Sequence, residues 1–293
     1  MYGADAGIRD VKRKMIMAEL KDFNKTKEYM VCVDSDGCAM DTMNIKHIRC
    51  FGPCMIKEWN LEKWQDEILK NWNKVNLYAI TRGINRFKGL AVALLEVNVK
   101  YTKIEGIEEF SKWADEAPEL SNRALEKLIG KHEIFAKALL WSKAVNREIE
   151  ALPKEEIKPF KGVKEALSLI HESCNVAVVS SANPEAVKSE WERFGLLDYV
   201  DIVCAQDVGS KSYCINEILK KGYSPKKVLM CGDALGDVRA AESNGVLYYP
   251  IRVNHENESW AEITGEPFER FIDKDYEGSY QSGLIDQFMD NLR

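Results

Sequence analysis

From residue 158 to 250 the sequence alternates between amphipathic helical segments and short apolar runs, and this alternation limits the fold more than any other feature. Helical segments such as PEAVKSEWERFG and YCINEILKKG lie between the runs VAVVS, YVDIVCA, KVLMCG and VLYYPI, and GVKEALSLIHES precedes the first of them. Strands that alternate with helices at this spacing are typical of a parallel sheet covered by helices on both faces. We assign the β-branched run at 30–34 to the same sheet, after a helical lead-in at about 8–27.

The region between the first strand and this alternation has a different pattern. From about 42 to 157 apolar residues recur at helical spacing, as in RFKGLAVALLEV and EIFAKALLWSKAV, and strand signals are nearly absent. We therefore predict an α/β protein with a Rossmann-like parallel-sheet core, residues 1–41 and 158–293, and an inserted all-helical domain, residues 42–157. The tail from 252 is predicted to be helical and to dock on the core.

Composition excludes several classes of protein. The 293 residues are 45% hydrophobic and carry a formal charge of −6, with no dense basic block, which argues against nucleic acid as a partner. No apolar run is long enough to span a membrane, and the first thirty residues are too charged for a secretory signal, so we expect a cytoplasmic protein without a membrane partner. The eight cysteines are expected to be buried free thiols, and Cys50 and Cys54 lack the partners of a zinc site.

Two acids, Asp34 and Asp36, follow the first strand in the segment VCVDSDG. Strand residues alternate between faces, so residues two apart lie on the same side, close enough to share a cation or a substrate. An EF-hand calcium loop needs a glycine at its sixth position and flanking helices, whereas Gly37 is fourth and follows a strand. A simple polar turn remains the alternative unless partners appear downstream.

Such partners follow the later strands. In open parallel sheets ligands bind beyond the carboxyl ends of the strands. The second strand is followed by two hydroxyl groups, the third by a lysine and the fourth by two more acids; these residues are Ser180, Ser181, Lys211, Asp233 and Asp237. Together they form a suitable set for a magnesium-assisted attack on phosphorus. Each has a plain structural alternative: Ser180 as a turn hydroxyl, Lys211 as a solvated surface lysine, and the pair of acids as helix N-terminal acids favoured by the helix dipole.

The order DSDG, VVSS, SK and GDALGD resembles the haloacid dehalogenase superfamily of aspartyl-phosphate-forming hydrolases, including its β-phosphoglucomutase-like and phosphoglycolate phosphatase-like members. The resemblance covers residues 29–41 and 158–250, and the helical insertion falls where the family places its cap. It implies a phosphomonoester hydrolase acting on a small phosphorylated metabolite, with Mg²⁺ as cofactor. A phosphomutase, or a non-catalytic binding module with the same fold, is the alternative.

By this resemblance Asp34 is the nucleophile, and Asp36 protonates the leaving group and then activates water. Mg²⁺ is held by Asp34, the Asp36 main-chain carbonyl and Asp233, with Asp237 beside it or as a further ligand. The phosphoryl oxygens are bound by Ser180, Ser181 and Lys211.

This chain departs from the family at two positions of the first motif. Cys38 replaces the usual threonine, and Ser35 stands where an apolar residue is common. The acid at Asp36 argues against haloacid dehalogenases and phosphonate hydrolases, and so favours cleavage or transfer of a phosphate ester.

The predicted cap contains a segment, ITRGINRF, that resembles the cap loop of β-phosphoglucomutase-like members. By this similarity Arg86 reaches the active site, accompanied by Arg82 and Gly83. The alternative is a surface arginine at the start of a helix capped by Asn85. His47 is interpreted as a packed or solvated helical histidine, and the tryptophans of this region as core residues.

Overall fold

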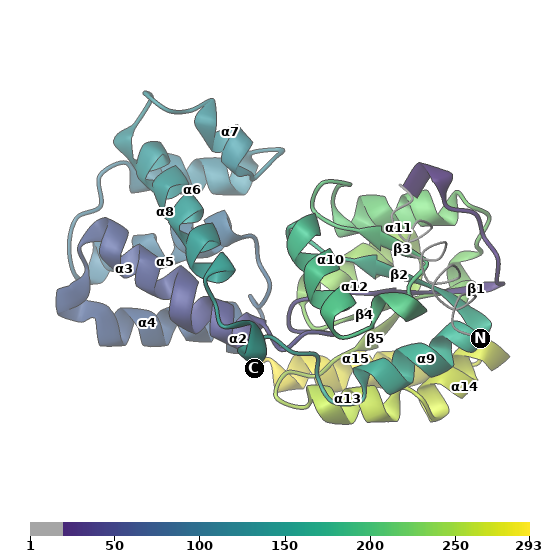
Figure 1. The fold of residues 1–293 in the computed structure, drawn as a ribbon. Helices are drawn as coiled ribbons and strands as arrows, with labels where there is room; N and C mark the ends of the chain where they lie inside the picture. Colours follow the sequence, from purple (N-terminus) through teal and green to yellow (C-terminus); the bar gives the residue numbers. More distant parts are fainter. Residues whose placement is uncertain (1–19) are drawn as a thin grey trace, which may run out of the picture. The chain divides into compact units, whose positions relative to one another are not determined.

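The computed structural model describes residues 20–293, and its strands form a single parallel sheet. The five strands are arranged in the order β3-β2-β1-β4-β5. Their bounds are β1 Tyr29–Val33, β2 Cys174–Val179, β3 Ile202–Cys204, β4 Val228–Gly232 and β5 Leu247–Pro250. In Figure 1 the purple strand β1 lies between the green strands β2 and β4, although the sequence separates it widely from both. The predicted fold class is confirmed.

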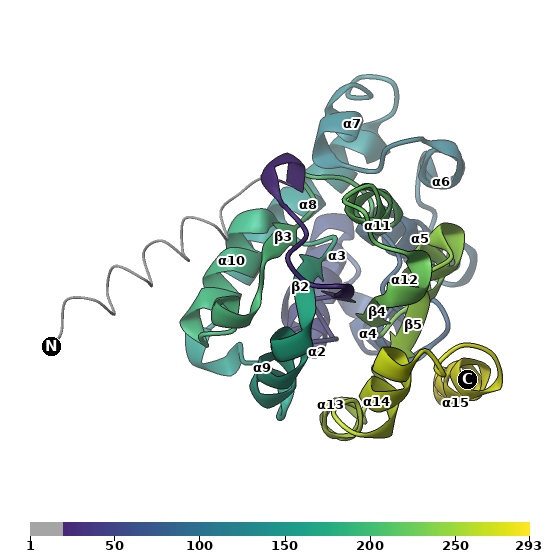
Figure 2. The same cartoon turned by 90° about the vertical axis from the view of Figure 1, so that its right-hand side faces the viewer.

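Helices cover both faces of this sheet, as Figure 2 shows, with α9 and α10 on one side and α11 and α12 on the other. The helices of the core are α9 Val163–Ser173, α10 Pro184–Arg193, α11 Lys211–Leu219, α12 Leu235–Asn244, α13 Glu256–Glu262, α14 Glu266–Asp273 and α15 Ser279–Asn291, with 3₁₀ turns η1 Leu20–Asp22, η6 Leu197–Tyr199 and η7 Pro225–Lys227. Because both faces are covered, every residue of β1, β2 and β4 is buried.

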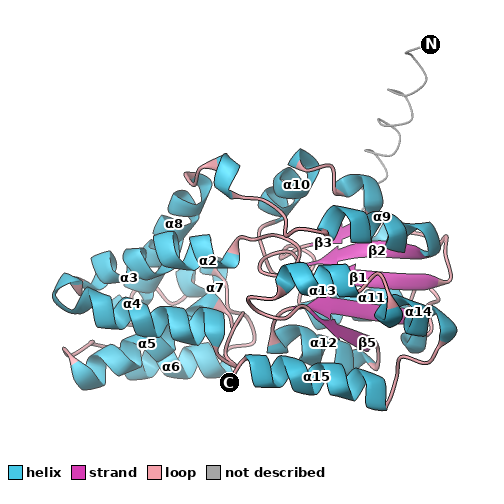
Figure 3. Cartoon of the chain, turned by 90° about the horizontal axis from the view of Figure 1, so that it is seen from below, coloured by secondary structure: helices cyan, strands magenta, loops and turns pink. Residues whose placement is uncertain are grey.

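The chain divides into two compact units. One unit combines the segment ending at Thr42 with Ile157–Arg293, and the other is Met43–Glu156. These limits differ by one residue from the boundaries drawn on the sequence. Figure 3 shows all the strands, in magenta, in the first unit.

The described residues of the inserted unit are helices and turns around one apolar core. Its elements are α2 Met43–Lys46, η2 His47–Phe51, α3 Gly52–Trp59, η3 Glu62–Trp64, α4 Gln65–Asn73, η4 Lys74–Tyr78, α5 Arg86–Lys100, α6 Ile107–Glu116, α7 Asn122–Glu126, α8 Glu133–Glu150 and η5 Lys154–Glu156. Its tryptophans belong to this core or pack against it, as predicted. None of the helices within residues 20–293 is both long and apolar enough to cross a membrane.

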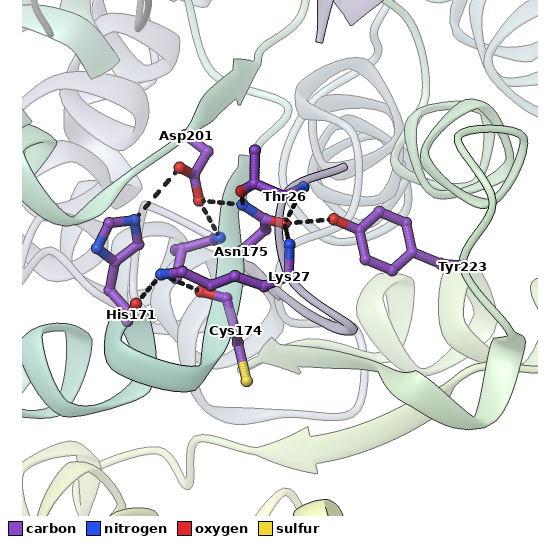
Figure 4. Close-up of polar contacts among 8 residues, drawn as sticks. Thr26, Lys27, His171, Cys174, Asn175, Asp201 and Tyr223 are labelled. Carbon is purple, nitrogen blue, oxygen red and sulfur yellow. Dashed lines mark hydrogen bonds and ion pairs between the residues drawn. The ribbon is translucent and has the colours of Figure 1, made fainter. Parts of the chain in front are cut away.

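The segment before β1 corrects one expectation. The predicted lead-in helix at 8–27 falls partly outside the described residues, and within them only the short turn η1 is helical. The backbone N–H groups of Thr26 and Lys27 donate instead to the side-chain Oδ1 of Asn175, at 3.1 and 2.8 Å. Figure 4 shows this contact. Hydrogen bonds to a buried side chain thus replace those of a helix.

The C-terminal extension from residue 252 is helical and packs on the core, as predicted. The hydroxyl of Tyr29 in β1 donates to the carbonyl of Ile272 at 2.8 Å, and Tyr276 donates to the carbonyl of Tyr248 at 2.9 Å. Phe271 is fully buried and meets the ring of Tyr29 edge to face, with centroids 5.2 Å apart.

Candidate active site

The turn after β1 carries the first two candidate acids. The backbone N–H of Asp34 still pairs with β4, donating to the Cys231 carbonyl at 3.0 Å, and the chain then leaves the sheet. The Ser35 carbonyl accepts the backbone N–H groups of Ala39 and Met40, at 3.0 and 2.8 Å, which closes the turn. Gly37 has a φ of 80°, a conformation that favours glycine.

The two acids are held differently. Asp34 is only 6% exposed, and its Oδ1 accepts the Ser35 backbone N–H at 2.7 Å. Asp36 is half-buried, and its Oδ1 accepts the hydroxyl of Thr42 at 2.6 Å. The expected strand alternation therefore does not extend to Asp36, because β1 ends at Val33 and the next residues form a turn.

Asp34, Asp233 and Asp237 instead form a buried cluster, in which one oxygen from each carboxylate lies within 4.8 Å of the others. Asp233 follows β4, the strand beside β1, and Asp237 lies in the first turn of α12. The carboxylate of Asp36 is outside this group of described residues.

Lys211 brings positive charge to this cluster. Its Nζ lies 2.7 Å from Asp34 Oδ2 and 2.5 Å from Asp237 Oδ1. Lys211 is the first residue of α11, because the Ser210 hydroxyl accepts the backbone N–H of Tyr213 and starts the helix there.

The electrostatics favour a cation. Burial raises the pKa of Asp34; Lys211 opposes this shift and the Asp233 carboxylate adds to it. Burial likewise raises the pKa of Asp237 to about 6. Burial alone would lower the pKa of Lys211, but Asp237 and Asp34 raise it, so the ammonium stays charged. Lys211 pairs with two of the three clustered carboxylates, Asp34 and Asp237, and a divalent cation with oxygen ligands suits such a cluster of buried acids.

The candidate phosphate-binding serines follow β2, the other neighbour of β1. Ser180 is buried; its backbone N–H donates to the Cys204 carbonyl at 2.9 Å, and its Oγ accepts the Ala182 N–H at 3.2 Å. Ser181 is exposed. Both serines therefore follow the carboxyl end of a strand beside β1, at the same end of the sheet as Asp34, as the sequence predicted.

The candidate residues of the inserted unit have partners within that unit. Asn85 caps α5, and the first residue, Arg86, donates from one guanidinium nitrogen to Ser142 Oγ at 3.1 Å and Asn146 Oδ1 at 2.7 Å. Arg82 is buried and donates to the Leu77 carbonyl at 2.7 Å. His47 is buried and stacks on Phe51 with ring centroids 4.5 Å apart, which agrees with a packed helical histidine.

Thr42 is a hydrogen-bond partner of Asp36 that was not predicted from the sequence. Its side chain is buried and reaches Asp36 only because the turn folds back on itself. A threonine six residues after an acid is not a recognisable pattern in sequence, so the contact depends on the path of the turn.

The sequence matches the family model of haloacid dehalogenase-like hydrolases over residues 99–249, just over half of the chain of 293 residues. The chain belongs to this family. Residues Ser180, Lys211, Asp233 and Asp237 lie within the matched range, which begins after Asp34 and Asp36. The membership identifies the protein as an enzyme of the hydrolase class, as the sequence led us to expect.

Solved structures of the haloacid dehalogenase-like family share its fold. A family member from Streptococcus pneumoniae is 12% identical, with a TM-score of 0.50, covering 80% of this chain and 92% of that one. A protein described as a haloacid dehalogenase-like hydrolase from Bacteroides fragilis is 13% identical, with a TM-score of 0.50, covering 80% of this chain and 93% of that one. A search of curated proteins gave no match.

Proposed function

We propose that this hydrolase is a Mg²⁺-dependent phosphatase that cleaves a small phosphorylated metabolite through an aspartyl-phosphate on Asp34. The observation that carries the proposal is the contact of Asp34 with Lys211, at 2.7 Å, inside a cluster of buried acids. A nucleophilic carboxylate must stay ionised, and a charged ammonium within hydrogen-bond distance favours the ionised form.

In this mechanism a carboxylate oxygen of Asp34 forms a bond to phosphorus while the bond from phosphorus to the alcohol oxygen breaks. Lys211 and Ser180 bind the phosphoryl oxygens, together with Ser181. Since Lys211 also pairs with Asp237, at 2.5 Å, its ammonium is held in place before substrate arrives.

Asp36 supplies the proton. It protonates the leaving alcohol in the first step. In the second step it removes a proton from the water that attacks phosphorus, and the bond from phosphorus to the Asp34 oxygen breaks, which releases inorganic phosphate and restores the carboxylate. Its half-exposed position and its contact with Thr42, at 2.6 Å, suit a group that must meet substrate and water in turn.

The donor set fits a hard divalent cation, because three carboxylates present oxygens within 4.8 Å of one another. Asp34, Asp233 and the main-chain carbonyl of Asp36 would hold Mg²⁺, with Asp237 beside them or as a further ligand. Bound there, Mg²⁺ would offset the charge that develops on the phosphoryl oxygens.

Substrate selection we assign to the inserted unit, residues 43–156, because the core candidates recognise only the phosphoryl group. Arg86 is the candidate for a contact with substrate. Its hydrogen bonds to Ser142 and Asn146 would have to be exchanged or shared in that role.

A screen of phosphorylated metabolites tests the proposal, with release of inorganic phosphate measured in Mg²⁺ and in EDTA. We expect release from a subset in Mg²⁺ only, and a loss of roughly 10³-fold or more in Asp34→Asn, which serves as the blank. Absence of release from every compound would contradict hydrolysis. A sugar phosphate that is isomerised only with a bisphosphate activator would replace the phosphatase by a phosphomutase.

A further inference from the structure

Two buried tryptophans from different helices donate hydrogen bonds to the turn that carries Asp34 and Asp36. The indole Nε1 of Trp260, in α13, donates to the Cys38 carbonyl at 2.8 Å. The indole Nε1 of Trp191, in α10, donates to the hydroxyl of Ser35 at 2.9 Å. Both side chains are fully buried, so water does not compete for these bonds.

The two indoles donate to atoms of the turn other than the carbonyl that closes it. The Ser35 carbonyl already accepts the N–H groups that close the turn, whereas its hydroxyl and the Cys38 carbonyl point to other elements. Internal bonds define the shape of a turn, and bonds to neighbouring elements define its orientation. Asp36 lies between Ser35 and Cys38, the two residues of the turn to which the indoles donate.

The helix that carries Trp260 is itself anchored to the core. The carbonyl of Ser259 accepts the hydroxyl of Tyr249, in β5, at 2.7 Å. The side chain of Asn257 accepts the backbone N–H of Lys161 at 2.8 Å, next to Phe160, whose own N–H donates to the Ala39 carbonyl at 3.0 Å. The start of the C-terminal extension therefore holds the turn and the chain segment paired with it.

We propose that Trp260 is a positioning residue, through which the C-terminal extension orients Asp36 for proton transfer, and that Trp191 supports the same turn from α10. This inference rests on the proposed phosphatase function. Trp260 acts through the backbone carbonyl of Cys38, and Trp191 acts through the side chain of Ser35.

The test compares two substrates that differ in their need for an acid. An alkyl phosphate has a poor leaving group and depends on the proton from Asp36, whereas p-nitrophenyl phosphate has a good leaving group and depends on it little. We expect Trp260→Phe to lower kcat about 10- to 100-fold on the best alkyl phosphate of the screen. On p-nitrophenyl phosphate the loss should stay below about 3-fold, and KM should change little on either substrate.

Tyr276→Phe is the matched control, because it removes another buried donor of the same extension from the carbonyl of Tyr248. It should lower the melting temperature without a difference between the two substrates. An equal loss on both substrates in Trp260→Phe, as in the control, would refute the positioning role.

Two further outcomes are distinguishable. If circular dichroism shows that Trp260→Phe does not fold, Ser35→Ala is tested in its place, since this variant removes only the hydroxyl to which Trp191 donates. The same selective loss on the alkyl phosphate is expected from Ser35→Ala. An equal loss on both substrates overturns the inference. If the wild-type enzyme releases phosphate from neither substrate in Mg²⁺, the proposed function itself fails. If the wild-type enzyme is active and Trp260→Phe loses activity equally on both substrates, the proposed function stands and only the positioning role of Trp260 is refuted.

Discussion

Asp237 illustrates how one side chain combines a structural and an electrostatic task. Its Oδ2 accepts the backbone N–H of Ala234 at 3.2 Å, at the start of α12, and its Oδ1 binds Lys211. From the sequence, Asp237 was either a helix N-terminal acid favoured by the dipole or an acid of the metal site. The geometry is compatible with both, because a carboxylate has two oxygens and each has its own partner.

Gly232 permits this arrangement. A Cβ at this position would overlap the side chain of Asp237. We expect Gly232→Ala to lower the free energy of unfolding by about 1–3 kcal/mol and to weaken activity, because Asp237 and Lys211 would both shift. Urea unfolding and phosphate release measure the two effects.

Gly236→Ala is the control for this prediction, since a Cβ at Gly236, in α12, would meet nothing within 4 Å. It should stabilise the protein by roughly 0.4–1 kcal/mol, because alanine favours a helix. Equal stabilities of the two variants would contradict the assigned overlap.

The buried acids predict a thermal response to Mg²⁺. A cation that binds only the folded state at about 100 times its Kd adds about 2.7 kcal/mol of stability. We expect Mg²⁺ to raise the melting temperature of the wild type by several degrees, and Asp233→Asn to lose this shift, since it removes one of the clustered carboxylates. Differential scanning fluorimetry measures both.

Asp36→Asn separates metal binding from proton transfer. Its main-chain carbonyl is unchanged, so the melting temperature should still rise with Mg²⁺ while hydrolysis of alkyl phosphates is lost. A lost thermal response in Asp36→Asn would mean that its carboxylate, and not its carbonyl, serves the metal.

At the scale of elements, a second polar cluster stabilises the opposite end of the sheet, at the amino end of β2 (Figure 4). Asn175 is fully buried, and its Oδ1 also accepts the Tyr223 hydroxyl at 2.7 Å. Its Nδ2 donates to Thr26 at 2.7 Å and Asp201 at 3.1 Å. Every polar atom of this amide has a partner, which makes its burial tolerable.

Asp201 makes this cluster sensitive to acid. Burial alone would raise its pKa, but hydrogen bonds from His171, the Val176 backbone and Asn175 outweigh burial and lower the pKa. A carboxylate with a lowered pKa stabilises the folded state above its unfolded pKa, near 4, and this contribution is lost as the pH falls towards the folded pKa.

We therefore expect Asp201→Asn to lower the free energy of unfolding by about 1–3 kcal/mol at pH 7, and the difference from wild type to shrink below about pH 4. Urea unfolding from pH 3 to 7 measures it. The exposed Asp198 provides the control: Asp198→Asn should remain within about 0.5 kcal/mol of wild type. A constant difference for Asp201→Asn across this range would exclude the carboxylate as its source.

The elements also show how far the sequence could predict this structure. Strand and helix periods located β1, β2 and β4, and hence the edge that gathers Asp34, Ser180 and Asp233, because these signals are local. The contacts of Thr42, Trp191 and Trp260 with the turn were not predictable, since each depends on where distant segments meet. Residues 23–27, at the end of the predicted lead-in helix, were misread for the same reason, because Asn175 takes the backbone donors of Thr26 and Lys27.

At the scale of the molecule, the eight cysteines are free, as expected, and seven are buried. Burial raises the pKa of Cys50 to about 11 and that of Cys174 to about 12, and Cys54 is the one partly exposed thiol. We expect Ellman's reagent at pH 8 to label at most Cys54 in the native protein, and all eight thiols after unfolding in guanidinium chloride. Fewer than eight after unfolding without reductant would reveal a disulfide.

The central place of β1 has a consequence for synthesis of the chain. Its partners, β2 and β4, both follow the inserted unit, so a nascent chain carries β1 without a partner while Met43–Glu156 is made. Pairings this distant in sequence form slowly, and an unpaired apolar strand invites wrong association. The inserted unit can begin to fold as it leaves the ribosome, but the carboxylate cluster of Asp34, Asp233 and Asp237 cannot assemble until the ribosome has passed Asp237.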